Sequence, residues 1–338
     1  MALDFQPEAP SPQRSLLAPP AGPLTGTRVI FWNERELRAG WRLAIFALFA
    51  FLLILGGDVL AIALRLPLAG RTNTTPPGMF VQECVTFLGA LAATAIMGFL
   101  ECRPFGSYGL PRAEVFGARF WQGALWGIAM IAATMALIGA LGGFSLGDLA
   151  LGGSEVWRYA LIWGAIFVLV GFSEEFMFRG YAQFTLTTGA GFWLSATVLS
   201  LAFGALHLLN GGEDVAGALS VFVVAMFLCL TLRRTGNLWF AVGAHAAFDW
   251  GETFLFSVPD SGIVAPGHLL NSSFHGPVWL TGGTVGPEAS VMSFVVVGVA
   301  AAIFARVYPS RAGFSLSHLP NADQPKSSEP STPGAGRA

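Results

Sequence analysis

The sequence predicts an all-α polytopic membrane protein, because its composition is strongly apolar and its apolar residues gather in long runs. Of 338 residues, 54% are hydrophobic and 11% are charged, whereas soluble domains carry about 25% charged residues. The mean hydropathy of +0.63 agrees with this class. The formal net charge of −2 provides no electrostatic basis for binding nucleic acid. The apolar composition makes the lipid bilayer the first expected partner.

Apolar segments of about 18 residues or more are long enough to cross a bilayer as helices. Eight such segments occur, at about residues 41–64, 80–100, 120–143, 157–180, 191–209, 215–232, 237–256 and 291–308. The fourth segment has no strong helix breaker before Gly189, so its helix can continue past residue 180. We therefore expect residues 39–308 to form a membrane domain of about eight helices.

The two ends of the chain differ in composition from this membrane domain. Residues 1–38 contain many prolines and predict a disordered or surface tail, and residues 309–338, rich in Pro, Ser and Gly, predict a disordered one. Arginines gather in the N-terminal tail, after the second and sixth segments, and after the last segment. The positive-inside rule therefore predicts both termini in the cytoplasm, with the chain in the plasma or inner membrane.

A long loop at 257–290 separates the last two apolar segments. The positive-inside prediction places this loop on the side of the membrane opposite the termini. A lid or a re-entrant segment is one interpretation of the loop, and a plain external loop is the simpler one.

Three charged residues lie together in the fourth apolar segment: Glu174, Glu175 and Arg179, within the sequence GFSEEFMFRG. A charged side chain at bilayer depth costs about 2.5–3.5 kcal/mol on insertion scales, so such residues usually face the bundle interior and mark function. Glu175 and Arg179 are four residues apart and can pair on one helix face. Glu174 is turned by about 100° from Glu175 and lacks that partner.

Two later segments also carry polar residues that lipid cannot accommodate. His207 lies near the end of the fifth segment, and His245 and Asp249 share one face of the seventh. Buried polar groups need hydrogen-bond partners, so a cavity shared by the fourth, fifth and seventh segments is the simplest arrangement. Glu174 is expected near mid-membrane, so it meets His207 only if the fifth helix is short or tilted, or if the expected boundaries are off by one turn.

Three further acidic residues stand in the apolar segments. Asp58 and Glu83 lie near segment ends, which favours structural positions at the membrane interface. Glu252 follows Asp249 by three residues and is expected to extend its polar face towards water.

Carboxylates and imidazoles in one cavity are the parts of a hydrolase that activates water. A carboxylate can act as general base on a water held by a histidine, and a histidine with an aspartate can stabilise an oxyanion. The same groups fit a divalent metal such as zinc, whose candidate ligands are Glu174, His207, His245 and Asp249. The sequence has no HExxH motif and no two histidines at helix-ligand spacing, which favours a metal-free site without a cofactor. No serine stands in a nucleophile elbow.

Three motifs occur in order on separate segments: EExxxR at Glu174–Arg179, FxxxH at Phe203–His207 and HxxxD at His245–Asp249. Together they resemble the motifs of the CPBP family, the CAAX-processing and bacteriocin-processing intramembrane proteases, also called the Abi family. The resemblance covers about residues 157–256, the expected catalytic core. It implies an eight-helix membrane endopeptidase similar to the Ras-converting endopeptidase.

The resemblance also implies a role for each motif residue. Glu174 and His207 would hold and activate the attacking water. His245 and Asp249 would bind the oxyanion that forms on a peptide or membrane-protein substrate. The remaining motif residues would support this site: Glu175, Arg179 and Phe203.

Asp249 stands where the prenyl protease has asparagine, and an ionised aspartate only accepts hydrogen bonds. Asp249 must therefore be protonated, orient His245, or ligate a metal. Two other functions remain open: a proton-coupled membrane transporter, since intramembrane Glu, His and Asp also make proton relays, and a non-catalytic immunity or scaffold protein of the same fold. The absence of a visible inverted repeat argues against the transporter.

Overall fold

The computed structural model describes residues 15–22, 24–69, 75–104 and 108–309, and nearly all regular structure in this part of the chain is helical. The α-helices are α1 (Arg28–Phe31), α2 (Ala39–Ala63), α3 (Pro76–Glu101), α4 (Ala118–Ala140), α5 (Ser154–Glu175), α6 (Gln183–Ala190), α7 (Phe192–His207), α8 (Val215–Thr235), α9 (Trp239–Trp250), α10 (Val278–Thr281) and α11 (Val291–Val307). Two segments, η3 (Phe176–Ala182) and η4 (Gly251–Leu255), are π-helical, and η2 (Arg112–Glu114) and η5 (Pro287–Ala289) are 3₁₀ turns.

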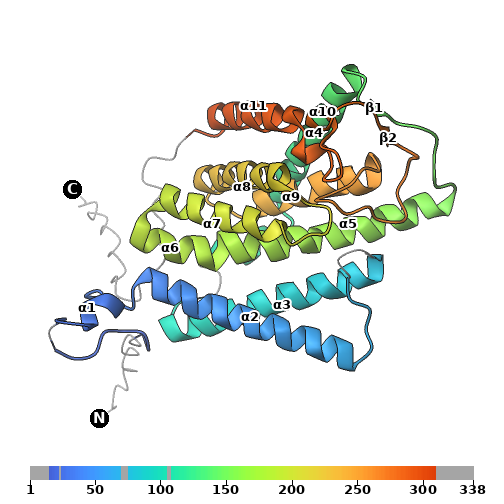
Figure 1. Cartoon of the computed structure of the whole chain (residues 1–338). Helices are drawn as coiled ribbons and strands as arrows, with labels where there is room; N and C mark the ends of the chain where they lie inside the picture. The colour runs from blue at the N-terminus through green and yellow to red at the C-terminus, as the bar shows by residue number, and fades with distance from the viewer. Residues whose placement is uncertain (1–14, 23, 70–74, 105–107, 310–338) are drawn as a thin grey trace, which may run out of the picture.

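The long helices form one bundle, with α1 at one end and a small antiparallel pair at the other (Figure 1). This pair joins β1 (Phe144–Ser145) to β2 (Ser273–Phe274), with Phe144 opposite Phe274. Of the predicted tails at 1–38 and 309–338, residues 1–14 and 310–338 lie outside the described residues. The all-α membrane class is therefore confirmed in its main features.

Five helical segments in the described part of the chain are long and apolar enough to cross a membrane: Ala39–Ala63, Pro76–Glu101, Ala118–Ala140, Ser154–Ala190 and Val215–Thr235. Helices also occupy the other three predicted segments, but the count of eight spans is not confirmed. α7 and α11 have 16 and 17 residues, and α9 has 12 before the π-helical turn. The predicted bounds were too long there because apolar residues continue into the adjoining loops.

The fourth segment continues past residue 180, as expected, and reaches Ala190. Its regular α-helix ends at Glu175 and becomes π-helical through Ala182, where Gly180 adopts a non-helical backbone with ψ −119°. A π-helix widens the turn, and such turns occur frequently at functional sites. The change in backbone geometry therefore begins directly after the two adjacent glutamates.

Small residues allow α4 and α9 to approach closely. A Cβ atom added at Gly127 would lie 2.1 Å from the carbonyl oxygen of Ala244, and one at Gly243 would lie 2.1 Å from that of Phe120. Such small-residue contacts let helix backbones touch in a membrane, where lipid provides no hydrophobic drive for association. This contact fixes the helix that carries His245.

A buried polar network joins the start of α2 to the end of α3 and to η3. Arg42 pairs with Glu36 and with Glu101, whose Oε1 lies 3.1 Å from Arg42 Nε. The Tyr181 hydroxyl donates to the same carboxylate at 2.5 Å. Because Tyr181 belongs to η3, this network ties α2 and α3 to the π-helical turn beside the candidate site.

Candidate active site

A cavity of about 190 Å³ opens between α3, α4, α5, α7, α8, α9 and the loop that follows η4. Its walls are mostly apolar, which is typical of a small-molecule or peptide site. The polar residues that line it come from four helices and the following loops: Glu83, Glu174, His207, Asn210, His245, Asp249, Thr253, Asp260, Ser261 and Glu288. The structure thus brings the fourth, fifth and seventh predicted segments to one cavity.

Glu175 lies behind the cavity wall, with its side chain fully buried. Arg179 Nη1 donates to Glu175 Oε1 at 3.2 Å, which is the ion pair that their spacing allows. His245 Nδ1 lies 2.9 Å from the same oxygen. Because a carboxylate paired with a guanidinium accepts hydrogen bonds, His245 Nδ1 is the donor in this contact. The ring of His245 is therefore held with Nε2 turned away from Glu175.

Glu174 faces the cavity and keeps 27% of its side chain exposed. His245 Nε2 lies 3.5 Å from Glu174 Oε2 and 3.4 Å from Asp249 Oδ2. The two adjacent glutamates therefore hold His245 from opposite sides, one enclosed and one accessible.

His207 lies at the last residue of α7, which is short enough to bring it to the cavity that Glu174 also lines. Its Nδ1 lies 2.9 Å from the carbonyl oxygen of Phe203. A carbonyl only accepts, so Nδ1 carries the proton, and Nε2 of the neutral ring keeps a lone pair. The Phe203 ring contacts His207 on one side, with centroids 4.5 Å apart, and Arg179 lies 4.6 Å from its centroid.

Residues 155–251 match the family model described as type II CAAX prenyl endopeptidase Rce1-like. The matched range is therefore similar to the CPBP, or CAAX protease, family whose motifs the sequence resembles. The matched range contains all three motifs, from Glu174 to Asp249, and confirms the family resemblance. No curated protein matches the chain.

Two acidic residues take positions that differ from the sequence expectation. Glu83 was expected at the interface, but it lines the cavity and accepts a hydrogen bond from Ser173 Oγ at 2.6 Å. Glu252 was expected to extend towards water, but it is fully buried in η4. Helical spacing shows which residues share a helix face, but not how deeply a side chain is buried. The residues that cover Glu83 and Glu252 come from other parts of the chain. Asp58 accepts a hydrogen bond from Gln82 at 3.1 Å.

The loop at 257–290 closes one end of the cavity, through Asp260, Ser261 and Glu288. The Ser261 amide donates to Glu288 Oε1 at 2.7 Å. Burial raises the pKa of Glu288 to about 8, and the charges of Asp260 and Glu213 add to this rise. A lid or a re-entrant segment was one interpretation of this loop, but sequence reasoning named none of these residues, because chain spacing does not show which loop residues reach the cavity. The acidic residues in that loop were the one available signal.

The four candidate zinc ligands do not gather within the distance that one metal ion needs. In the described residues, one group of three acidic or histidine side chains has ligand atoms within 4.8 Å of one another, and it comprises Asp249, Glu252 and Asp260. His207 stands outside that group. The CPBP motif histidines therefore face the cavity as separate groups.

Proposed function

We propose that this chain is a membrane endopeptidase that cleaves peptide bonds with a water molecule activated by Glu174 and His207. The main support is that an accessible carboxylate and two histidines from three helices line one cavity inside a membrane-type bundle. The family match supports the same reaction class. The apolar walls exclude bulk water from these groups, which strengthens their electrostatic interactions with a bound peptide.

The proposed reaction starts with a water between Glu174 and His207. Glu174 takes one proton from the water, while Nε2 of His207 accepts a hydrogen bond from the remaining O–H. The water oxygen attacks the scissile carbonyl carbon, and the carbonyl oxygen becomes an oxyanion. Glu174 then returns the proton to the leaving amine as the carbon–nitrogen bond breaks.

His245 is the proposed donor to the oxyanion. Its Nδ1–H is committed to Glu175, so a second proton on Nε2 makes the ring a cation whose free N–H faces Glu174, Asp249 and the cavity. A donor held in place before the reaction stabilises developing charge without reorganisation. Before the oxyanion forms, Asp249 Oδ2 accepts from this N–H, 3.4 Å from Nε2, and so orients the ring.

The proposed substrate class is a lipid-modified C-terminal peptide, because the matched family is described by CAAX prenyl endopeptidase activity. A peptide segment of another membrane protein is the alternative. Both share an apolar anchor that concentrates the peptide at the bilayer. We further propose that both termini face the cytoplasm, as the arginine distribution indicates.

The test uses the full chain purified in detergent, with fluorogenic peptides that carry or lack a C-terminal prenyl group. Glu174→Gln keeps the side-chain size and removes the base, so turnover should fall by about 10²-fold or more. Its melting temperature should stay near that of the wild type. Full turnover in the Glu174 variant would exclude the proposed base. Proton uptake by reconstituted vesicles without any cleavage would instead support the transporter.

A further inference from the structure

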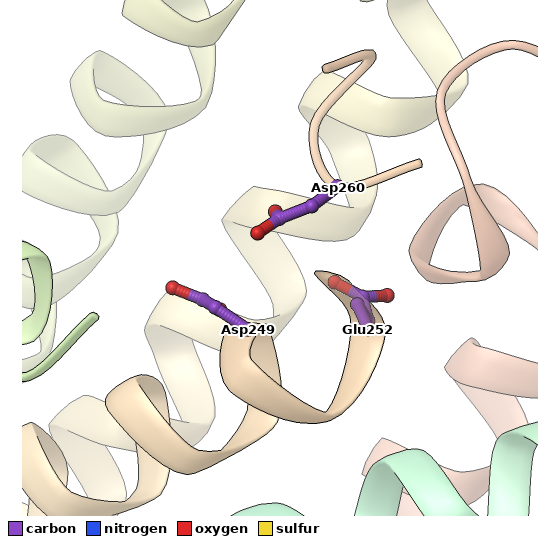
Figure 2. Close-up of side chains that lie close together, drawn as sticks. All are labelled: Asp249, Glu252 and Asp260. Atoms are coloured by element: carbon purple, nitrogen blue, oxygen red, sulfur yellow. The ribbon is translucent and has the colours of Figure 1, made fainter. Parts of the chain in front are cut away.

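Three carboxylates meet at the end of α9 that is closest to the loop at 257–290. Asp249 comes from the last turn of α9, Glu252 from η4, and Asp260 reaches over from the loop (Figure 2). One oxygen from each lies within 4.8 Å of the other two. Like charges repel strongly at this separation in a poorly solvated site, and His245, 3.4 Å from Asp249, can offset one of the three, so Glu252 and Asp260 need a further compensating group.

Glu252 carries the second observation. Its side chain is fully buried, and within the described residues neither of its oxygens has a hydrogen-bond partner. Leaving a buried carboxylate without a partner costs several kcal/mol as an order of magnitude. Its charged neighbours in the described structure are acidic: Asp249, Asp260, Glu213 and Glu288. A positive ligand between the three carboxylates removes this conflict.

We propose that Asp249, Glu252 and Asp260 form a binding site for a hard divalent cation of the size of Ca²⁺. Oxygen ligands favour Ca²⁺, Mg²⁺ or Mn²⁺ over zinc, which prefers nitrogen and sulfur. Ca²⁺–oxygen distances are about 2.3–2.6 Å, so ligands on opposite sides of the ion lie about 4.6–5.2 Å apart. The spread of up to 4.8 Å in the structure therefore suits one such ion.

The surroundings prepare these ligands for an ion. Thr253 Oγ1 donates to Asp260 Oδ2 at 3.1 Å and holds that carboxylate towards the helix end. Asp249 and Asp260 also line the cavity, which offers an entry path, while Glu252 closes the site from the buried side. A π-helical turn at Gly251–Leu255 places Glu252 on this side of the helix.

Cation binding has a consequence for the catalytic site, and this step rests on the proposed function. A bound cation keeps Asp249 ionised, so Asp249 accepts a hydrogen bond and cannot donate one to an oxyanion. Asp249 then positions His245, whose Nε2 is 3.4 Å away. The cation itself lies beside the reacting groups and takes no part in the proposed bond cleavage.

The test is calcium binding by the full chain, which requires no substrate. Protein purified with a chelator is transferred to chelator-free buffer and titrated with Ca²⁺, while its melting temperature and bound ⁴⁵Ca²⁺ are measured. The expected result is one ion per chain and a rise of about 3 °C or more at saturation. E252Q and D260N should each lose the Ca²⁺-dependent rise. E213Q, which removes a neighbouring carboxylate outside the site, should keep it.

Three outcomes would overturn the cation site. If wild-type protein shows no Ca²⁺-dependent shift and binds no ⁴⁵Ca²⁺, shared protons neutralise the three carboxyl groups instead. An unchanged shift in both E252Q and D260N places the ion elsewhere. A shift with Zn²⁺ but not with Ca²⁺ or Mg²⁺ excludes a hard cation. If Ca²⁺ binds but no peptide is cleaved, the cation site stands and the proposed function fails.

Discussion

His245 Nδ1 lies 2.9 Å from Glu175 Oε1, so the buried member of the glutamate pair holds the imidazole that the accessible member meets from the other side. The same Glu175 oxygen is 3.2 Å from Arg179. One carboxylate thus neutralises a buried guanidinium and fixes the tautomer of a cavity histidine. This division explains why two adjacent glutamates differ in exposure and, in the proposed reaction, in role.

Glu175→Gln should lower both stability and turnover. The substitution leaves Arg179 buried without its charged partner, and breaking such a pair typically costs about 3–5 kcal/mol. His245 also loses its ionised acceptor, so turnover should fall even in the folded fraction. Melting temperature in detergent and peptide cleavage, measured on the same preparation, check both effects. Loss of cleavage without any loss of stability would move the base from Glu174 to Glu175.

Phe203→Leu should reduce turnover more than it reduces stability. Its ring contacts both Arg179 and His207, and a leucine supports neither the cation–π contact nor the position of the imidazole. We expect a roughly tenfold lower kcat, equivalent to about 1.4 kcal/mol, with little change in KM. Phe178→Leu is the matched control, because Phe178 contacts the Phe203 ring at 4.8 Å from another helix. Equal losses in both variants would show a packing effect alone.

The helical segments were predictable because each apolar run differs sharply from its flanks. The run expected at 41–64, for example, forms α2 at Ala39–Ala63. The motif residues were predictable because charges inside apolar segments are rare. The contact of His245 with Glu175 was missed, because the spacing rules relate residues on one helix and this pair joins two. Asp260 was missed for the same reason, since it reaches the site only through a returning loop.

Gly127→Ala should destabilise the bundle by about 2 kcal/mol or more and lower cleavage. The new methyl group would lie 2.1 Å from the carbonyl oxygen of Ala244, so α4 and α9 must separate. That separation moves His245, which directly follows Ala244 on α9. Gly139→Ala on the same helix is the control, since its Cβ finds its nearest atom at 3.8 Å. Thermal melting of both variants checks this prediction, and equal melting temperatures would contradict the close contact.

The proposed orientation predicts opposite signals from two reporter fusions. A fusion after Thr235, which follows Arg233 and Arg234 at the end of α8, should report the cytoplasm. A fusion at His268, in the loop between η4 and α10, should report the other side of the membrane. Paired phosphatase and fluorescent-protein reporters distinguish the two compartments. A cytoplasmic signal at His268 would overturn the orientation and the predicted number of spans.

Stability should fall as pH rises from about 4.5 to about 7, because of Glu213 in the loop before α8. Burial raises the pKa of the Glu213 carboxyl to about 7, from an ordinary value of 4.5. Between these values the unfolded chain has released the proton and the folded chain retains it. The unfolded state therefore binds fewer protons, and the free energy of unfolding decreases with pH. Below pH 4.5 both states are protonated, so the stabilisation is fully present there and is lost as pH passes about 7.

Glu213→Gln removes this titration, because the amide stays neutral at every pH. The melting temperature of the variant, measured in detergent with a chelator from pH 5 to pH 8, should fall less with pH than that of the wild type. Glu155→Gln is the matched control, since Glu155 is an exposed carboxylate paired with Arg158 on the surface. That control should follow the wild-type curve. Parallel curves for Glu213→Gln and the wild type would show that Glu213 is ionised in the folded protein across this range.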